Sequence, residues 1–256
     1  MINFTSKPRY VLDDLIRLVH VLRAPGGCPW DAAQTHLSIR RNFLEEAYEA
    51  CEALDCDDEA MLREELGDVL LQVLFHADIE ADRGRMTIDD IADAECRKLI
   101  FRHPFLFGGE RASWDELKKQ EKGQKTTGEA MQGVARSLPA TWRAEKIQKK
   151  AAKTGFCWES AGQALDKLAE EAQELREAVR DNTNIDEELG DMLFAAVRVA
   201  STLDKDPEQA LHSACEKFIR RFTAMEQSIL AEGRTLEEVS REELLASWDA
   251  QKRNGR

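Results

Sequence analysis

The sequence predicts an all-α protein built from two tandem, duplicated helical domains. Only 14 glycines and 6 prolines occur among 256 residues, so residues that interrupt helices are scarce. Charged residues make up 33% of the chain and hydrophobic residues 43%, a mixture typical of long amphipathic helices. No segment shows the alternation of polar and apolar residues that a half-buried strand requires. Similar motifs recur in the same order in both halves of the chain, which indicates a duplication.

The first half is expected to form helices separated by short breaks, at 11–23, 37–54, 59–81, 88–101 and 114–121. The second of these carries the motif LEEAYE at 44–49, and the third carries EELGDVL at 64–70. The fourth contains Lys98-Leu-Ile-Phe-Arg102, and Ala112-Ser-Trp-Asp115 leads into the fifth. Each of these motifs has a counterpart later in the chain.

The second half repeats this order in helices expected at 140–152, 162–180, 185–203, 207–231 and 236–251. Their motifs are AEEAQE, EELGDML, Lys217-Phe-Ile-Arg-Arg221 and Ala246-Ser-Trp-Asp249. Between the halves, the segment KGQKTTGEAMQGVARSLP has the weakest apolar pattern of the chain, with three glycines and one proline. We therefore predict a first domain at 1–121, a linker at 122–139 and a second domain at 140–256.

Charge and composition exclude several classes of protein. The chain has 36 basic and 49 acidic residues and a net charge of −13, which argues against nucleic-acid binding. It has no apolar stretch of the roughly 20 residues needed to span a membrane, and its first residues lack the apolar core of a signal peptide. A cytoplasmic location is therefore expected. The six cysteines form no Cys-x-x-Cys pair and are expected to be reduced and mostly buried.

Acidic residues are grouped at helical spacing in both halves. Glu45, Glu46 and Glu49 share one face of a predicted helix, because residues three and four apart are neighbours. Glu65 and Asp68 share a face of the next helix, and a short connection makes the two helices antiparallel neighbours. The second half repeats the pattern with Glu170, Glu171, Glu174, Glu188 and Asp191. Each half therefore predicts a convergence of carboxylates.

A solvated acidic face is the simpler interpretation of such a group. Apolar residues at 69–75 and 192–197 follow the last aspartate of each group, however, and would surround the helix on nearly all sides. We expect both segments to be buried, so the carboxylates beside them would be partly desolvated and would need a partner. Gly67 and Gly190 lie inside these helices, which suggests that another backbone or a ligand approaches closely. Converging carboxylates suit a hard cation such as Mg²⁺, and Mg²⁺ is commonly completed by substrate phosphates.

The paired pattern Glu-Glu-x-x-Glu and Glu-x-x-Asp resembles the signature of the MazG family of nucleoside triphosphate pyrophosphohydrolases. Gly27-Cys-Pro-Trp-Asp31, Arg102-His-Pro104 and the segment 138–158 extend the resemblance to nearly the whole chain, in the two-domain form of the family. The resemblance implies an all-α fold and a homodimer in which helices of the two subunits pack together. It also implies Mg²⁺-dependent hydrolysis of NTP or dNTP to the monophosphate and pyrophosphate.

The resemblance further implies the roles of individual residues. The metal ligands would be Glu171, Glu174, Glu188 and Asp191, and in the first half Glu46, Glu49, Glu65 and Asp68. Glu170 would support these ligands or orient water, and the nucleotide contacts would be Lys167, Lys217, Arg221 and Trp248. In the first half, Asn42 stands at the position of Lys167, so one cation is missing there. We therefore expect the C-terminal site to carry most of the activity.

Other interpretations stay open at this point. Lys217 and Arg221 could be an ordinary surface pair, and Trp248 could be a core residue. The duplication and Asn42 also fit a non-catalytic, helical dimer that binds nucleotide and metal as a sensor or partner-binding module. A purely structural helical scaffold is a third possibility, which the predicted desolvation of the carboxylates disfavours.

Overall fold

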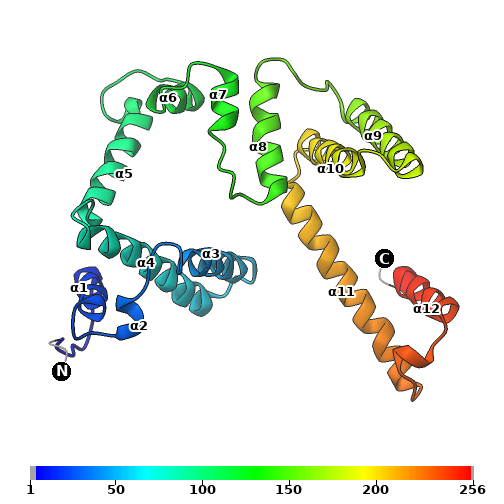
Figure 1. Cartoon of the computed structure of the whole chain (residues 1–256), viewed down its shortest axis with the longest axis horizontal. Coiled ribbons are helices and arrows are strands. Elements are labelled where there is room, and N and C mark those ends of the chain that lie inside the picture. The colour runs from blue at the N-terminus through cyan, green and yellow to red at the C-terminus, as the bar shows by residue number, and fades with distance from the viewer. Residues whose placement is uncertain (1–3, 255–256) are drawn as a thin grey trace. The chain divides into compact units, whose positions relative to one another are not determined.

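The computed structural model describes residues 4–254, apart from the side chains of Asp115 and Asn254. Within this range the chain forms helices and loops but no strand, which confirms the predicted all-α class (Figure 1). The chain divides into two compact units, Met1–Lys118 and Lys119–Arg256, and each unit is described by itself. No helix in the described range is long and apolar enough to cross a membrane.

The first unit is built around a pair of helices that pack side by side, α3 and α4 (Figure 1). In chain order its elements are α1 (Leu12–Arg23), α2 (Pro29–Ala32), α3 (Arg40–Asp55), α4 (Glu59–Asp82), α5 (Ile88–Arg102) and the 3₁₀ turn η1 (Pro104–Leu106). Helix α6 (Trp114–Glu121) crosses the boundary between the units. Helix α1 packs against α4, and the buried core between them contains Val19, Ile39, Leu74, Phe75 and Ile79.

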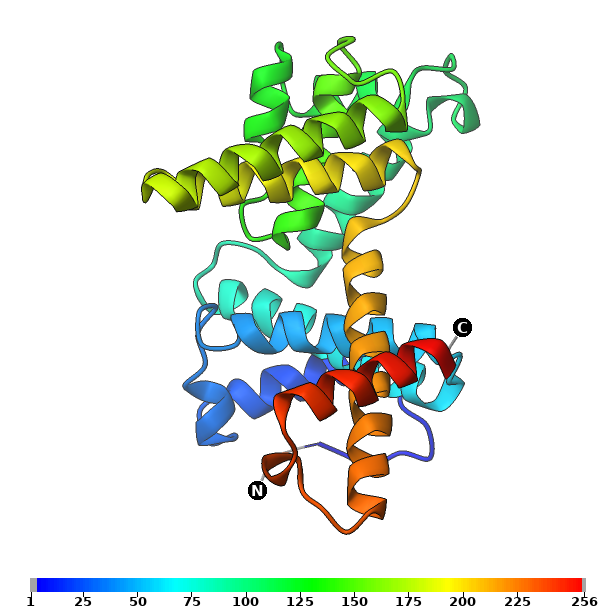
Figure 2. The same cartoon turned by 90° about the vertical axis from the view of Figure 1, so that its right-hand side faces the viewer.

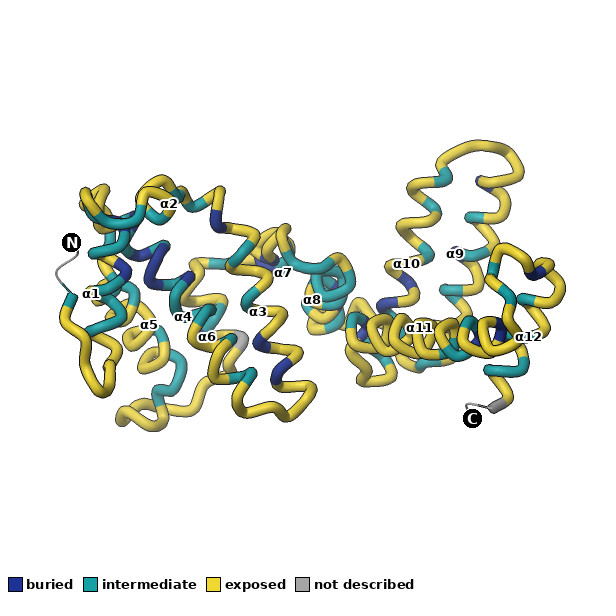
Figure 3. The backbone as a smooth tube through the Cα atoms, turned by 90° about the horizontal axis from the view of Figure 1, so that it is seen from below, coloured by how far each residue is buried: buried dark blue, intermediate teal, exposed yellow. Residues whose placement is uncertain are grey.

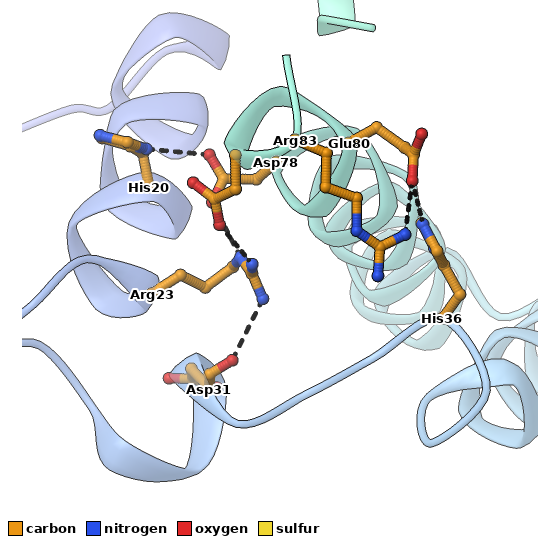
Figure 4. Close-up of polar contacts among 8 residues, drawn as sticks. His20, Arg23, Asp31, His36, Asp78, Glu80 and Arg83 are labelled. Carbon is orange, nitrogen blue, oxygen red and sulfur yellow. Dashed lines mark hydrogen bonds and ion pairs between the residues drawn. The ribbon is translucent and has the colours of Figure 1, made fainter. Parts of the chain in front are cut away.

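A buried arginine joins three elements of the first unit (Figure 4). Arg23, the last residue of α1, donates from Nε to Asp78 Oδ2 and from Nη2 to Asp82 Oδ2, each at 2.8 Å. Its Nη1 donates to the backbone oxygen of Asp31 in α2 at 3.2 Å, and its guanidinium lies 5.6 Å from the centre of the Phe75 ring. The charge is therefore paired and its planar face is covered, which is what a buried arginine requires.

The second unit contains a group of four helices, followed by one long helix and a final helix (Figure 2). Its elements are α7 (Thr127–Gln132), α8 (Ala140–Ala152), α9 (Ala161–Asp181), α10 (Ile185–Thr202), α11 (Pro207–Ala231), the 3₁₀ turn η2 (Leu236–Glu238) and α12 (Arg241–Asn254). Helices α9 and α10 pack side by side, and α8 packs against α10. Helix α12 returns along the end of α11, where Met225, Ile229 and Val239 form a small core.

The expected helices are present, but some boundaries and short elements differ. The last helix begins at Arg241 rather than 236, because η2 precedes it and the chain is extended at Val239. The short elements α2, η1 and α7 were not expected, since four, three and six residues show no clear periodicity. Helix α7 lies within the predicted linker and packs against α8, with Ala130 buried. The domain limits at 121 and 140 stay a prediction.

Burial differs from the expectation at several positions (Figure 3). The apolar run after Asp68 is partly or fully buried, but Leu193 and Phe194 in the corresponding run of α10 are exposed. The reason is that α8 and α9 cover only part of α10 within one chain. A Cβ atom placed on Gly67 or Gly190 would meet nothing within 4 Å, so the expected close approach is absent within the described chain. The six cysteines are free, as expected, but five are exposed.

Candidate functional site

Each unit brings three glutamates together from two neighbouring helices. Ligand atoms of Glu171 and Glu174 on α9 and Glu188 on α10 lie within 4.8 Å of one another. In the first unit, ligand atoms of Glu46 and Glu49 on α3 and of Glu65 on α4 also lie within 4.8 Å of one another. The convergence predicted from helical spacing is therefore present in both units.

The aspartate of each motif lies close to its trio. Asp191 lies three residues after Glu188 on α10 and lines the same cavity as Glu171. In the first unit, the negative charge of Asp68 acts on Glu46. The structure therefore brings three of the four predicted metal ligands of each unit within 4.8 Å of one another, and the role of the aspartate as a fourth ligand stays a prediction.

Crowding of negative charge perturbs these carboxylates. Partial desolvation raises the pKa of Glu174, and the neighbouring charge of Glu171 raises it further. Desolvation likewise raises the pKa of Glu46, with added repulsion from Asp68 and Glu49, and the pKa of Glu65 is raised by desolvation and the charge of Glu49. A divalent cation among these oxygens would relieve the repulsion and favour the ionised forms. Because all the donors are carboxylate oxygens, the set fits Mg²⁺.

A lysine completes the second cluster but has no equivalent in the first. Lys167 Nζ lies 2.8 Å from Glu171 Oε1 and 2.9 Å from Glu170 Oε1. These two hydrogen bonds raise the pKa of Lys167, so the ammonium stays charged. Glu45, which matches Glu170, instead accepts from Arg41 Nε at 2.7 Å on the exposed side of α3. The second unit alone therefore has a lysine at this position beside the three glutamates.

The carboxylates of the second unit adjoin a cavity of about 400 Å³. Side chains from α7, α8, α9, α10 and the loop before α9 line it: Met131, Ile147, Gln148, Ala151, Phe156, Cys157, Trp158, Ala164, Lys167, Glu171, Asp191, Phe194, Ala195 and Arg198. Most of these residues are apolar or aromatic, and the polar ones are few. Such a concave site, apolar with a small number of polar groups, is typical of small-molecule binding.

Larger side chains occupy the matching positions of the first unit. The repeat, taken with the offset of each helix, pairs Ala151 with Arg23, Ala164 with Ile39 and Ala195 with Gln72. Arg23, Ile39 and Gln72 are only 9%, 3% and 8% exposed, so all three are packed into the interior of the first unit. The cavity of the second unit thus exists where three alanines replace larger, buried side chains.

One chain brings only some of the predicted nucleotide contacts to this site. Lys167 lines the cavity, whereas Lys217, Arg221 and Trp248 are not among the lining residues. Lys217 and Arg221 lie on α11, and Trp248 on α12 packs on Phe218 with ring centres 5.1 Å apart. Trp248 also contacts the small core of α11 and α12, which agrees with the alternative interpretation of Trp248 as a core residue. The binding roles of these three residues stay predictions.

Sequence reasoning missed several residues of the cavity wall. Gln148, Phe156 and Arg198 line the cavity but belong to no motif that names a chemical role. A signal was nevertheless present in the repeat, because at three positions that line the cavity alanine in the second copy faces a larger residue in the first. The same contrast also occurs outside the cavity, so it indicates extra space only together with the burial of the larger residues in the first unit.

Comparison with known proteins relates the chain to one family. The sequence model described as MazG nucleotide pyrophosphohydrolase domain matches residues 34–107 and 160–224. The nucleoside triphosphate pyrophosphohydrolase/pyrophosphatase MazG of Thermotoga maritima is 41% identical over 246 residues, which cover 94% of this chain and 96% of that protein. The nucleoside triphosphate pyrophosphohydrolase of Escherichia coli K12 is 40% identical over 255 residues, covering 94% and 97%. The protein YabN of Bacillus subtilis is 40% identical over 251 residues, covering 93% of this chain and 51% of YabN.

Proposed function

The chain belongs to the MazG family of nucleotide pyrophosphohydrolases, and from this premise we propose that it hydrolyses nucleoside triphosphates to the monophosphate and pyrophosphate. We place the reaction mainly at the C-terminal site, on α9 and α10, and propose Mg²⁺ as the metal. Ribonucleotides and deoxyribonucleotides both belong to the proposed substrate class. Because these nucleotides are cytoplasmic metabolites, we expect the enzyme in the cytoplasm.

The contrast between the two units is the observation that carries this proposal. Both units bring three glutamates together, but only the second adds Lys167 beside them and has small side chains where the first has Arg23, Ile39 and Gln72. A nucleotide needs both a charged end for its phosphates and space for its nucleoside. The second unit supplies both, which supports catalysis at the C-terminal site.

In the proposed reaction, the oxygen of a water molecule attacks the α-phosphorus and the bond from this phosphorus to the bridging oxygen of the β-phosphate breaks. Pyrophosphate leaves with the bridging oxygen, the oxygen of the water stays on the monophosphate, and one proton of the water passes to the solvent. Glu171, Glu174, Glu188 and Asp191 would hold Mg²⁺, which supplies positive charge to the phosphates when bound.

Two further residues act beside the metal ligands in this proposal. Lys167 adds a fixed positive charge near the phosphates, because its hydrogen bonds to Glu170 and Glu171 hold the ammonium in place. The carboxylate of Glu170 lies on the open side of the cluster, and we assign it the orientation of the attacking water.

We also propose a homodimer, in which the exposed apolar face of α11 packs against a second copy. Phe218 and Ile219 are 55% and 54% exposed, and Phe222 and Leu211 are exposed on the same helix. A contiguous apolar surface of this kind is typical of an interface between subunits. Size-exclusion chromatography with light scattering should give the mass of two chains. A mass of one 29.0 kDa chain would contradict the dimer.

Product analysis tests the proposed reaction. Each ribonucleoside and deoxyribonucleoside triphosphate should be incubated with the protein and Mg²⁺, and the products separated by ion-exchange chromatography. We expect monophosphate and pyrophosphate in equal amounts. Release of diphosphate and orthophosphate would contradict attack at the α-phosphorus. Tight binding of nucleotide without any turnover would instead support the non-catalytic sensor.

A further inference from the structure

The cavity of the second unit contains a buried hydrogen-bond acceptor without a partner. Gln148 on α8 is 6% exposed and lines the cavity. Its Nε2 donates to the backbone oxygen of Phe194 on α10 at 2.8 Å, whereas its Oε1 is buried and accepts no hydrogen bond. The hydrogen bond to Phe194 fixes the orientation of the amide, because an oxygen at the position of Nε2 could not donate. The side chain therefore presents an acceptor and not a donor.

An unpaired buried acceptor is costly, since about 90% or more of buried polar groups in proteins are hydrogen-bonded. Other buried side-chain atoms among the described residues also lack a partner, on Gln72, Arg143, Ser201 and Arg221, but these side chains do not line the cavity. Gln148 differs from them because it borders a space that a ligand can enter. The missing partner is therefore best assigned to a bound molecule.

The rest of the wall restricts what that molecule can be. Phe156 and Trp158 contribute aromatic rings, and Met131, Ile147 and the three alanines contribute apolar surface. Three of the charged residues, Lys167, Glu171 and Asp191, lie at the carboxylate cluster. A fourth, Arg198, lines the cavity about two turns further along α10. A flat, mostly apolar ring that carries an N–H group fits such a wall, and a nucleobase is a ring of this kind that stacks on aromatic side chains.

We propose that Gln148 is a specificity-determining residue, whose Oε1 accepts a hydrogen bond from an N–H group on the pairing edge of the substrate's base. The inference rests on the proposed function, because it assumes that the phosphates lie at the carboxylates of the same unit. Adenine and cytosine offer an amino group, and guanine and uracil offer a ring N–H, so one acceptor serves all four bases. The residue thus selects for a base with a free N–H rather than for one particular base.

At the position that matches Gln148, the first unit has a different side chain. His20 stands at the position of Gln148, and its Nδ1 lies 2.9 Å from Asp78 Oδ1 (Figure 4). That side chain is also largely exposed and already has a partner. Gln72 in the first unit also has a buried Oε1 without a partner, but this side chain is packed into the interior and does not line the cavity. Among the described residues, Gln148 is therefore distinguished by presenting its unpaired acceptor to the cavity.

A chemical analogue tests the proposal. UTP and N3-methyl-UTP differ in the ring N–H that Gln148 would bind, and kcat and KM should be measured for both with the wild-type enzyme and with Gln148→Met. We expect the wild type to use N3-methyl-UTP at least about tenfold less efficiently than UTP, chiefly through KM, because an acceptor stays unpaired. In Gln148→Met, kcat/KM for UTP should exceed kcat/KM for N3-methyl-UTP by less than about threefold.

Controls separate this proposal from the proposed function and from a structural defect. Ribose 5-triphosphate lacks a base, so the wild type and Gln148→Met should hydrolyse it equally. As a matched control, Gln209→Met on the exposed face of α11 should show the wild-type ratio of kcat/KM between UTP and N3-methyl-UTP. An equal loss on ribose 5-triphosphate would mean that Gln148 is only structural. If Gln148→Met fails to fold, the wild-type ratio alone still tests the idea, because equal use of both nucleotides contradicts it. Lack of any wild-type turnover of UTP would contradict the proposed function instead.

Discussion

Filling the cavity with the side chain found in the first unit should remove activity and keep the fold. Ala164 is 1% exposed and lines the cavity, and Ile39 is its counterpart in the repeat. Ala164→Ile adds three carbons, whose burial contributes about 2.4 kcal/mol at about 0.8 kcal/mol each. Overpacking strain of about 1–3 kcal/mol offsets this gain. We therefore expect the free energy of unfolding to change by no more than about 2 kcal/mol, while kcat/KM falls at least about tenfold.

The reciprocal variant is the matched control. Ile39→Ala removes a buried side chain from the core of the first unit and should cost about 2–5 kcal/mol of stability. It should leave hydrolysis at the second unit within about twofold of the wild type. Thermal unfolding gives the stability change, and pyrophosphate release at several UTP concentrations gives kcat and KM. Full activity of Ala164→Ile with an unchanged KM would refute the assignment of the nucleoside to this cavity.

Three further substitutions test separate parts of the account. Lys167→Asn, which installs the residue of the first unit, should lower kcat/KM at least about tenfold through loss of a charge near the phosphates, and unchanged kinetics would contradict that role. Gly190→Ala should raise the free energy of unfolding by about 1 kcal/mol in calorimetry, because the site has room within the chain; destabilisation would show that a second copy approaches it. Desolvation and the neighbouring His36 lower the pKa of His76 below 6.5, so the unfolded chain binds this proton more readily. Stability should therefore fall as the pH drops below about 6.5. His76→Gln should reduce this loss of stability, measured as the difference in Tm between pH 8 and pH 5.5. An equal difference in the wild type and the variant would mean that another group causes the loss.

The helices and the carboxylate clusters could be predicted because they depend on local spacing. Glu171 and Glu174 share a face of one helix through their separation of three residues, and the short connection to α10 brings Glu188 beside them. Duplication strengthened the prediction, since chance does not place the same pattern twice in the same order. The signal for α7 was also local, in the capping pair Thr126 and Glu129, but a six-residue helix adds little periodicity.

The cavity could not be predicted in the same way, because it depends on side chains from elements that are distant in sequence. The orientation of Gln148 follows from its hydrogen bond to Phe194 on another helix, and no spacing rule reports such a contact. The prediction that Leu193 and Phe194 are buried is wrong within a single chain. An apolar pattern indicates only that a surface must be covered. It does not show whether the cover comes from the same chain or from a second copy.

The measurement that tests the central claim most directly compares Glu188→Gln with Glu65→Gln. Each variant removes one negative charge from an equivalent trio, so the pair reports which unit hydrolyses the nucleotide. Pyrophosphate release from a panel of nucleoside triphosphates with Mg²⁺ should fall at least about 100-fold in Glu188→Gln, an increase of about 2.7 kcal/mol in the activation barrier, with the helical circular dichroism unchanged. Glu65→Gln should stay within about threefold of the wild type. Normal hydrolysis by Glu188→Gln, or an equal loss in Glu65→Gln, would contradict catalysis at the C-terminal site.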